Sequence, residues 1–225
     1  EPFELDLPTP QHVVSPLLDS LVEKLNRAKR PLLFLGKGVH SSQAYQEVQR
    51  FAQHWKIPVM TTPGGKGTFL SNHSLSLGGF GLGGTEAANR FSLEEQVDVL
   101  IVMGTRLSDM SLAGFTERHF PKEVVHFDYD PTFIGKGINV PTTPILGDLR
   151  TNLSLLLEKV EETNDTSFLT EKQRHPVEFD GEWMTAETTL KVMRNSLPDE
   201  AIVFGDDGSH SFYGVKYFDI FKPGT

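Results

Sequence analysis

The order of apolar and polar positions predicts a chain in which helices and strands alternate. Apolar residues spaced three or four positions apart predict helices over residues 14–25 and 44–55. Short unbroken apolar runs predict strands that are buried on both faces, as the strands of parallel sheets are. These runs cover residues 32–35, 57–60, 97–103, 124–127 and 142–146. Asp148 is a predicted N-cap for a further helix, over residues 149–160.

Strands joined by helices in this way predict an α/β fold. We expect a doubly wound, mostly parallel six-stranded sheet, a Rossmann-like domain over residues 1–160. Residues 161–181 are polar and predict a linker. Residues 182–225 begin a second α/β segment, with a helix face from 186 to 197, a strand at 201–204 and a helix at 209–218. One strand and two helices cannot bury a core of their own, so this incomplete segment is expected to dock on the first domain, dock on another chain or stay loose.

The overall composition excludes several classes of protein. The formal charge is −9, from 21 basic and 30 acidic residues, which argues against a nucleic-acid or anionic-membrane surface. The chain has no cysteine, so disulfides and thiolate catalysis are excluded. No apolar run is long enough to cross a bilayer, and the first residues do not have the pattern of a signal peptide, so a cytoplasmic location is the default expectation.

In a doubly wound sheet, ligands bind beyond the carboxyl ends of the strands. Glycine there lets a ligand approach backbone amides, a helix N-terminus favours phosphate, and a carboxylate can accept hydrogen bonds from ribose hydroxyls. Turns and helix caps also use Gly and Asp at such places, but five such strand ends in one sheet favour a nucleotide-binding crevice. Arg106 is the candidate for the ligand's charged group and Asp128 for its ribose. The candidate residues at the strand ends are Gly36, Gly38, Thr61, Thr62, Gly104, Thr105, Arg106, Asp128 and Asp148.

Shorter motifs do not identify a more specific site. Gly36-Lys37-Gly38 follows a predicted strand, but Ser41 stands in place of the third glycine of a dinucleotide fingerprint, and no acidic residue ends the next strand. Residues 63–68 have the composition of a phosphate loop with the wrong spacing. The histidines have no metal-binding spacing, and the chain has no Gly-x-Ser-x-Gly elbow of a hydrolase.

A longer series of motifs carries a family resemblance. Residues 81–89 read Gly-Leu-Gly-Gly-Thr-Glu-Ala-Ala-Asn, and residues 104–109 read Gly-Thr-Arg-Leu-Ser-Asp. His-Phe-Asp-Tyr-Asp at 126–130, Ile-Gly-Lys at 134–136 and Gly-Asp at 147–148 follow. In order and spacing this series resembles the middle domain of thiamine-diphosphate enzymes of the acetolactate synthase type. The resemblance covers roughly residues 31–157 and resumes at Ile202, before a segment similar to the family's Asp-x-Gly-Gln-His.

The resemblance implies a cofactor site in each part of the chain. The family's middle domain holds FAD in many members and ADP or nothing in others, and the matching positions add Gly81, Gly84 and Thr85 to the crevice. Gly83, Ser108 and Met110 replace the family's His, Asp and Arg, and a lost guanidinium removes a donor fork for phosphate or flavin. FAD, ADP and an empty site therefore stay open. In the second part, the resemblance implies that Gly208, Ser209 and His210 touch the diphosphate of thiamine diphosphate.

The resemblance also implies an activity for a longer parent protein. Such a parent, with thiamine diphosphate and Mg²⁺, would decarboxylate pyruvate and transfer the product to a second 2-oxo acid in branched-chain amino acid biosynthesis, as a homo-oligomer. The family's catalytic Glu precedes the region that resembles this chain and its metal motif follows it, so we expect the chain alone to be inactive and to contain no catalytic or metal-binding residue. Pyruvate oxidase or another thiamine-diphosphate decarboxylase is an alternative, and a stand-alone, non-catalytic nucleotide-binding module is an alternative of another class.

Overall fold

The computed structural model describes residues 15–160, 168, 181, 183–206 and 208–225. The predicted linker at 161–181 lies, apart from residues 168 and 181, outside the described residues. No described helix is long and apolar enough to cross a membrane.

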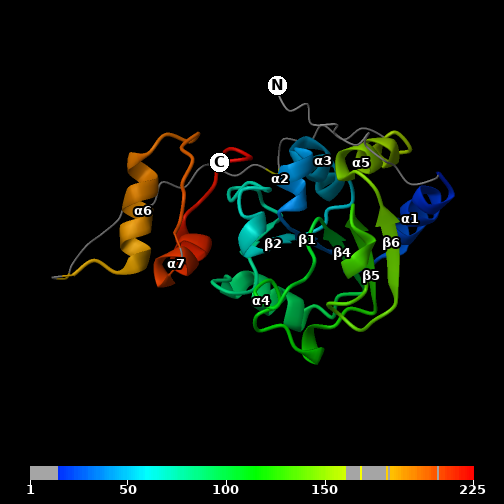
Figure 1. Cartoon of the computed structure of the whole chain (residues 1–225), viewed down its shortest axis with the longest axis horizontal. Coiled ribbons are helices and arrows are strands. Elements are labelled where there is room, and N and C mark those ends of the chain that lie inside the picture. The colour runs from blue at the N-terminus through cyan, green and yellow to red at the C-terminus, as the bar shows by residue number, and fades with distance from the viewer. Residues whose placement is uncertain (1–14, 161–167, 169–180, 182, 207) are drawn as a thin grey trace, which may run out of the picture.

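A six-stranded parallel sheet forms the centre of the fold (Figure 1). The strand order is β3-β2-β1-β4-β5-β6, the order of a Rossmann sheet, so the predicted fold class is confirmed. The strands are β1 (Leu32–Leu35), β2 (Val59–Thr61), β3 (Ser76–Gly79), β4 (Val99–Met103), β5 (Glu123–Asp128) and β6 (Thr142–Leu146). Five of them match the apolar runs, and β3 has no such run.

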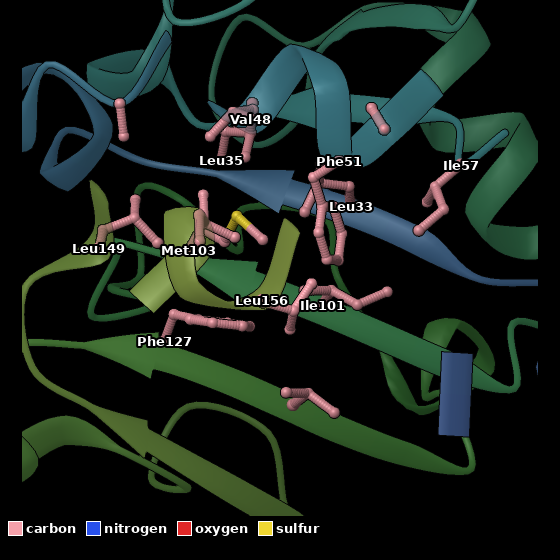
Figure 2. Packing of buried hydrophobic residues seen from close by; sticks show 14 of the residues in the cluster. Leu33, Leu35, Val48, Phe51, Ile57, Ile101, Met103, Phe127, Leu149 and Leu156 are labelled. Carbon is pink, nitrogen blue, oxygen red and sulfur yellow. The ribbon is translucent and has the colours of Figure 1, made fainter. Parts of the chain in front are cut away.

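Alternate residues of the inner strands face two separate cores. Leu33 and Leu35 of β1 point into one core, and Leu32 and Phe34 point into the other, all at most 1% exposed. This burial on both faces is why the strand is wholly apolar. Figure 2 shows the first core, where Phe51 lies over β1. The helices that contribute to this core are α1 (Ser15–Arg27), α2 (Gly38–Ser42), α3 (Tyr45–His54) and α5 (Leu149–Leu157).

The second face is covered by α4 (Glu86–Glu94) and by the irregular segments after β4. Three short 3-10 helices lie in the loops of the domain: η1 (Pro63–Gly65), η2 (Glu117–His119) and η3 (Pro131–Phe133). Phe80, which follows β3, packs edge-on against Phe34 and Phe115 and joins the sheet to these segments. The loops that follow the strands are therefore anchored on a sheet that is packed on both faces.

The second part of the chain forms a small lobe beside the sheet. It contains α6 (Ala186–Ser196) and α7 (Ser209–Tyr217), which pack against each other, and α7 lies against β3. Figure 1 shows this lobe at the side of the sheet opposite β6. Of the three alternatives for this segment, the structure has it docked on the first domain.

The predicted strand at 201–204 is wrong. The described residues of this segment form no helix or strand, and Ile202 and Phe204 are 65% and 91% exposed. A strand is defined by hydrogen bonds to a neighbouring strand, and no strand in the part of the chain that the structure describes pairs with this segment. Propensity alone therefore does not make this segment a strand.

Candidate functional site

A crevice of about 470 Å³ opens at the carboxyl ends of the strands. Residues that follow β1, β2 and β4 line it, together with the last residue of β5. It lies where the strand order reverses between β1 and β4, the place at which doubly wound folds bind ligands. The lining residues are Lys37, Gly38, Thr62, Pro63, Gly64, Gly104, Thr105, Arg106, Ser108, Met110, Ser111 and Asp128.

Close contact between two glycine loops lies beside the crevice. A Cβ on Gly36 would lie 2.3 Å from Cβ of Thr105, and one on Gly38 would lie 2.5 Å from Cα of Gly104. The Gly36 N–H donates to the Met103 carbonyl at 2.9 Å, and the Gly38 N–H donates to the Gly104 carbonyl at 2.8 Å. Glycine is required here because only glycine lets the two backbones approach to this distance.

Charged groups of both signs line the crevice. Lys37 and Arg106 supply two cations, and Asp128 supplies a carboxylate. The Arg106 guanidinium lies over the ring of Phe133, 5.0 Å from the ring centroid. Asp128 Oδ1 accepts a hydrogen bond from the Asp130 N–H at 3.0 Å, which fixes the turn after β5. This arrangement can pair with an anion through the two cations and can accept hydrogen bonds through the carboxylate.

His126 of β5 contacts the backbone that lines the crevice. Its side chain is buried, and its Nε2 lies 2.9 Å from the carbonyl oxygen of Thr105. Burial lowers the pKa of His126. The neutral imidazole therefore donates from Nε2 to the Thr105 carbonyl and holds that backbone in place.

Several of the predicted residues lie outside the lining. Gly36 lies behind the Gly104–Thr105 backbone, and Thr61 is buried in β2. Asp148 caps α5, since its Oδ1 accepts hydrogen bonds from the Thr151 N–H and hydroxyl, both at 2.8 Å. The structure therefore brings Gly38, Thr62, Gly104, Thr105, Arg106 and Asp128 together at the crevice.

The glycine-rich loop after β3 abuts the crevice without lining it. Gly81 has φ +91°, and a Cβ there would lie 2.5 Å from the carbonyl oxygen of Met110. A Cβ on Gly84 would lie 3.0 Å from the Gly81 carbonyl oxygen. Thr85 is the N-cap of α4, where its hydroxyl accepts the Ala88 N–H at 3.3 Å.

Six residues that line the crevice were not among the candidate site residues: Lys37, Pro63, Gly64, Ser108, Met110 and Ser111. The family resemblance placed Ser108 and Met110 at this site only as replacements of the family's Asp and Arg. Lys37 stands between two glycines that were predicted, and its position alone could have identified it. The segment from Ser108 to Ser111 folds back over the strand ends, where Ser108 Oγ lies 3.3 Å from Ser111 Oγ. No apolar periodicity in the sequence signals this return.

The second candidate site is the first turn of α7. Gly208 has φ +144° and precedes the helix, and Ser209 and His210 are exposed in its first turn. The first N–H groups of a helix have no partner within the helix, so this turn can bind an anion. The residues that the structure describes contain no group of three or more His, Cys, Asp or Glu placed to hold a metal ion.

Comparison with known proteins shows which families and proteins the chain is similar to. Residues 18–156 match the family model described as "Thiamine pyrophosphate enzyme, central domain". The acetolactate synthase large subunit of Corynebacterium glutamicum is 31% identical over 100% of this chain and 38% of its own length. The large subunit of Parasynechococcus marenigrum is 34% identical over 92% of this chain and 35% of its own length. Acetolactate synthase 1 of Nicotiana tabacum is 30% identical over 92% of this chain and 32% of its own length.

The fold is also found among solved structures. The X-ray structure of a protein described as a thiamin diphosphate-dependent enzyme, from Mycobacterium smegmatis, has a TM-score of 0.75 and 22% identity to this chain. The similarity covers 98% of this chain and 42% of that one. The family match covers the whole sheet and the crevice at its carboxyl edge. The chain therefore belongs to the thiamine pyrophosphate enzymes, and residues 18–156 are their central domain.

Proposed function

We propose that this chain is part of an acetolactate synthase, which decarboxylates pyruvate and transfers the product to a second 2-oxo acid. The observation that carries the proposal is the similarity to acetolactate synthase large subunits over 92% to 100% of this chain. The chain spans 38% of the length of the Corynebacterium glutamicum relative, so the activity is proposed for a longer protein. The proposal includes a cytoplasmic homo-oligomer in branched-chain amino acid biosynthesis.

Thiamine diphosphate is the proposed cofactor, and it supplies the electron sink for decarboxylation when bound. Gly208, Ser209 and His210 would hold its diphosphate, since the exposed first turn of α7 offers N–H groups and the Ser209 hydroxyl. The described residues contain no cluster suited to Mg²⁺. The ligands of the proposed Mg²⁺ would therefore come from residues that the structure does not describe or that lie outside this chain.

We propose that the crevice binds an adenine nucleotide, either ADP or the ADP half of FAD. Lys37 and Arg106 would pair with its phosphates, and Asp128 would accept hydrogen bonds from its ribose. Gly38 and Gly104 both line the crevice, and their close contact with each other fixes the backbone on that side of it. Met110, which lines the crevice and is 56% exposed, stands in place of the family's arginine and removes a donor for phosphate and flavin alike, so the proposal covers both ligands.

Calorimetric titration of ADP and FAD into the chain tests the crevice. We expect Arg106→Ala to weaken binding by roughly 10- to 150-fold, since a hydrogen bond to a charged group contributes about 1.5–3 kcal/mol. Arg90→Ala is the matched control, because Arg90 is exposed on α4 and does not line the crevice. Absence of binding to the unaltered chain at about 1 mM ligand would refute the proposed nucleotide site.

Acetolactate formation tests the activity. The protein encoded by the complete reading frame is expected to form acetolactate from pyruvate with thiamine diphosphate and Mg²⁺, and this chain alone is expected to form none. Acetolactate from the chain alone would refute the view that it is part of a larger active site. Nucleotide binding without activity in the complete protein would favour a non-catalytic nucleotide-binding module. Gel filtration of the complete protein tests whether it is a homo-oligomer.

A further inference from the structure

The C-terminal segment is held on the loop between β2 and β3 by two backbone hydrogen bonds and one bond to a side chain. The Ser71 N–H donates to the Ile220 carbonyl at 2.8 Å, and the Ile220 N–H donates to the Ser71 hydroxyl oxygen at 2.8 Å. The Gly224 N–H donates to the Gly67 carbonyl at 3.0 Å. These bonds join residues about 150 positions apart, so the segment after α7 has a defined place on the central domain.

Two glycines let α7 approach the sheet edge. A Cβ on Gly79 of β3 would lie 3.1 Å from Cγ1 of Val215, and one on Gly83 would lie 2.6 Å from the carbonyl oxygen of Phe212. Gly83 also has φ +77°, which side chains disfavour. The side of α7 that carries Phe212 and Val215 is therefore in direct contact with the central domain.

Lys66 holds the C-terminal end of the same helix. Its Nζ donates to the Val215 carbonyl at 2.9 Å, across 149 positions of sequence. The Val215 carbonyl is one of the last four of α7, which have no partner within the helix. An ammonium at a helix C-terminus is also favoured by the helix dipole. Lys66 therefore satisfies an acceptor that the helix itself leaves open.

The Lys66 ammonium is enclosed between the loop and the helix. Burial lowers the pKa of Lys66 to about 8, an effect that the charge of Asp219 opposes. The backbone of Lys66 is fixed as well, because its carbonyl oxygen lies 2.8 Å from Nε2 of His40. The Lys66 side chain therefore extends from a fixed backbone, and its ammonium donates to the Val215 carbonyl.

We propose that Lys66 is a positioning residue for the cofactor, one that sets the direction in which α7 presents its first turn. The Val215 carbonyl that Lys66 binds is six residues after Ser209, about 9 Å along the helix, so Lys66 acts on the Gly208–Ser209–His210 turn through the helix. The helix is short and its C-terminal half is held by Lys66, Gly79 and Gly83. A change of tilt in the C-terminal half of α7 therefore also moves its first turn. This inference rests on the proposed binding of thiamine diphosphate.

Calorimetry with thiamine diphosphate and Mg²⁺ on the complete protein tests the inference. We expect Lys66→Met, which keeps the apolar stem and removes the donor, to raise the dissociation constant roughly tenfold. Lys66→Arg keeps a donor and is expected to restore much of the affinity. Lys122→Met is the control, because Lys122 is exposed beside β5. Steady-state rates should show a raised KM for the cofactor with kcat unchanged at saturation.

Hydrogen exchange separates a positioning role from a purely structural one. In this chain, Lys66→Met is expected to speed exchange of the hydrogen-bonded amides of α7, from Tyr213 to Tyr217, while the exchange of β1 and β4 stays unchanged. An unaltered dissociation constant in Lys66→Met, with binding to the unaltered protein intact, would overturn this inference alone. Absence of thiamine diphosphate binding to the unaltered protein would overturn the proposed function, and the inference with it.

Discussion

Gly36→Ala places a single methyl group where the loops after β1 and β4 touch. The added Cβ would lie 2.3 Å from Cβ of Thr105 and 2.5 Å from the carbonyl oxygen of Gly104. Two non-bonded carbons need about 3.5–4.0 Å, so the two strand ends must separate by more than an ångström. That movement stretches the bonds that Gly36 and Gly38 donate to Met103 and Gly104, at 2.9 and 2.8 Å.

The cost follows from these two contributions. Overpacking a rigid site costs about 1–3 kcal/mol, and each weakened backbone hydrogen bond costs about 1 kcal/mol. We therefore expect Gly36→Ala to lower the free energy of unfolding by about 3–5 kcal/mol, a large part of the stability of a domain of this size. The same shift moves Thr105, which lines the crevice, so nucleotide affinity should fall with it.

Urea unfolding followed by circular dichroism measures this change, with Gly64→Ala as the matched control. A Cβ on Gly64 meets only Cβ of Lys37, at 3.8 Å, which is ordinary contact, and Gly64 has no positive φ. We expect the control to change stability by less than about 1 kcal/mol. Equal stability of Gly36→Ala and Gly64→Ala would refute the argument that the backbone contact between the two strands requires glycine.

Three further predictions concern a buried histidine, a helix cap and the docked lobe. Burial lowers the pKa of His73 to about 4. Between pH 6.5 and 4, His73 is therefore protonated in the unfolded chain but not in the folded one. Up to about 3 kcal/mol of folding stability is lost as the pH falls through this range. Urea midpoints at pH 7 and 4.5 should differ less in His73→Gln, and an equal loss would contradict this. Asp148→Ala should cost about 1 kcal/mol by urea unfolding, because the cap on the Thr151 N–H is lost, whereas Asp148→Asn keeps an acceptor and should cost little. Gly83→His should expose α7 to proteolysis, since its Cβ would lie 2.6 Å from the Phe212 carbonyl oxygen, and unchanged protection would disprove this contact.

The sheet could be predicted from sequence where a strand is buried on both faces. The unbroken apolar runs of β1 and β4 leave no other place for these residues than the middle of a layered fold. The edge strand β3 reads Ser-Leu-Gly-Gly and has no such pattern. Its glycines are required by tertiary neighbours, Thr85 beside Gly78 and Val215 beside Gly79, which a local pattern cannot contain.

The candidate site was predictable only where it coincides with strand ends. Gly104 and Asp128 line the crevice because β4 and β5 end there, and strand ends follow from the apolar runs. Met110 and Ser111 reach the crevice through an irregular segment that folds back, so their place depends on packing. The unpaired segment at 201–204 failed as a predicted strand for a related reason, since strand formation depends on a partner.

That unpaired segment affects how the chain behaves in concentrated solution. Ala-Ile-Val-Phe at 201–204 has no charge, no proline and high β-propensity, and Phe204 is 91% exposed. Unpaired apolar segments of this kind offer free backbone N–H and C=O groups with which another copy can pair. Preparations of the chain should therefore self-associate as concentration rises, and Ile202→Lys should slow this because a charged side chain interrupts the apolar run. The same residue is 65% exposed, so the substitution buries no charge and leaves the packed cores of the central domain untouched.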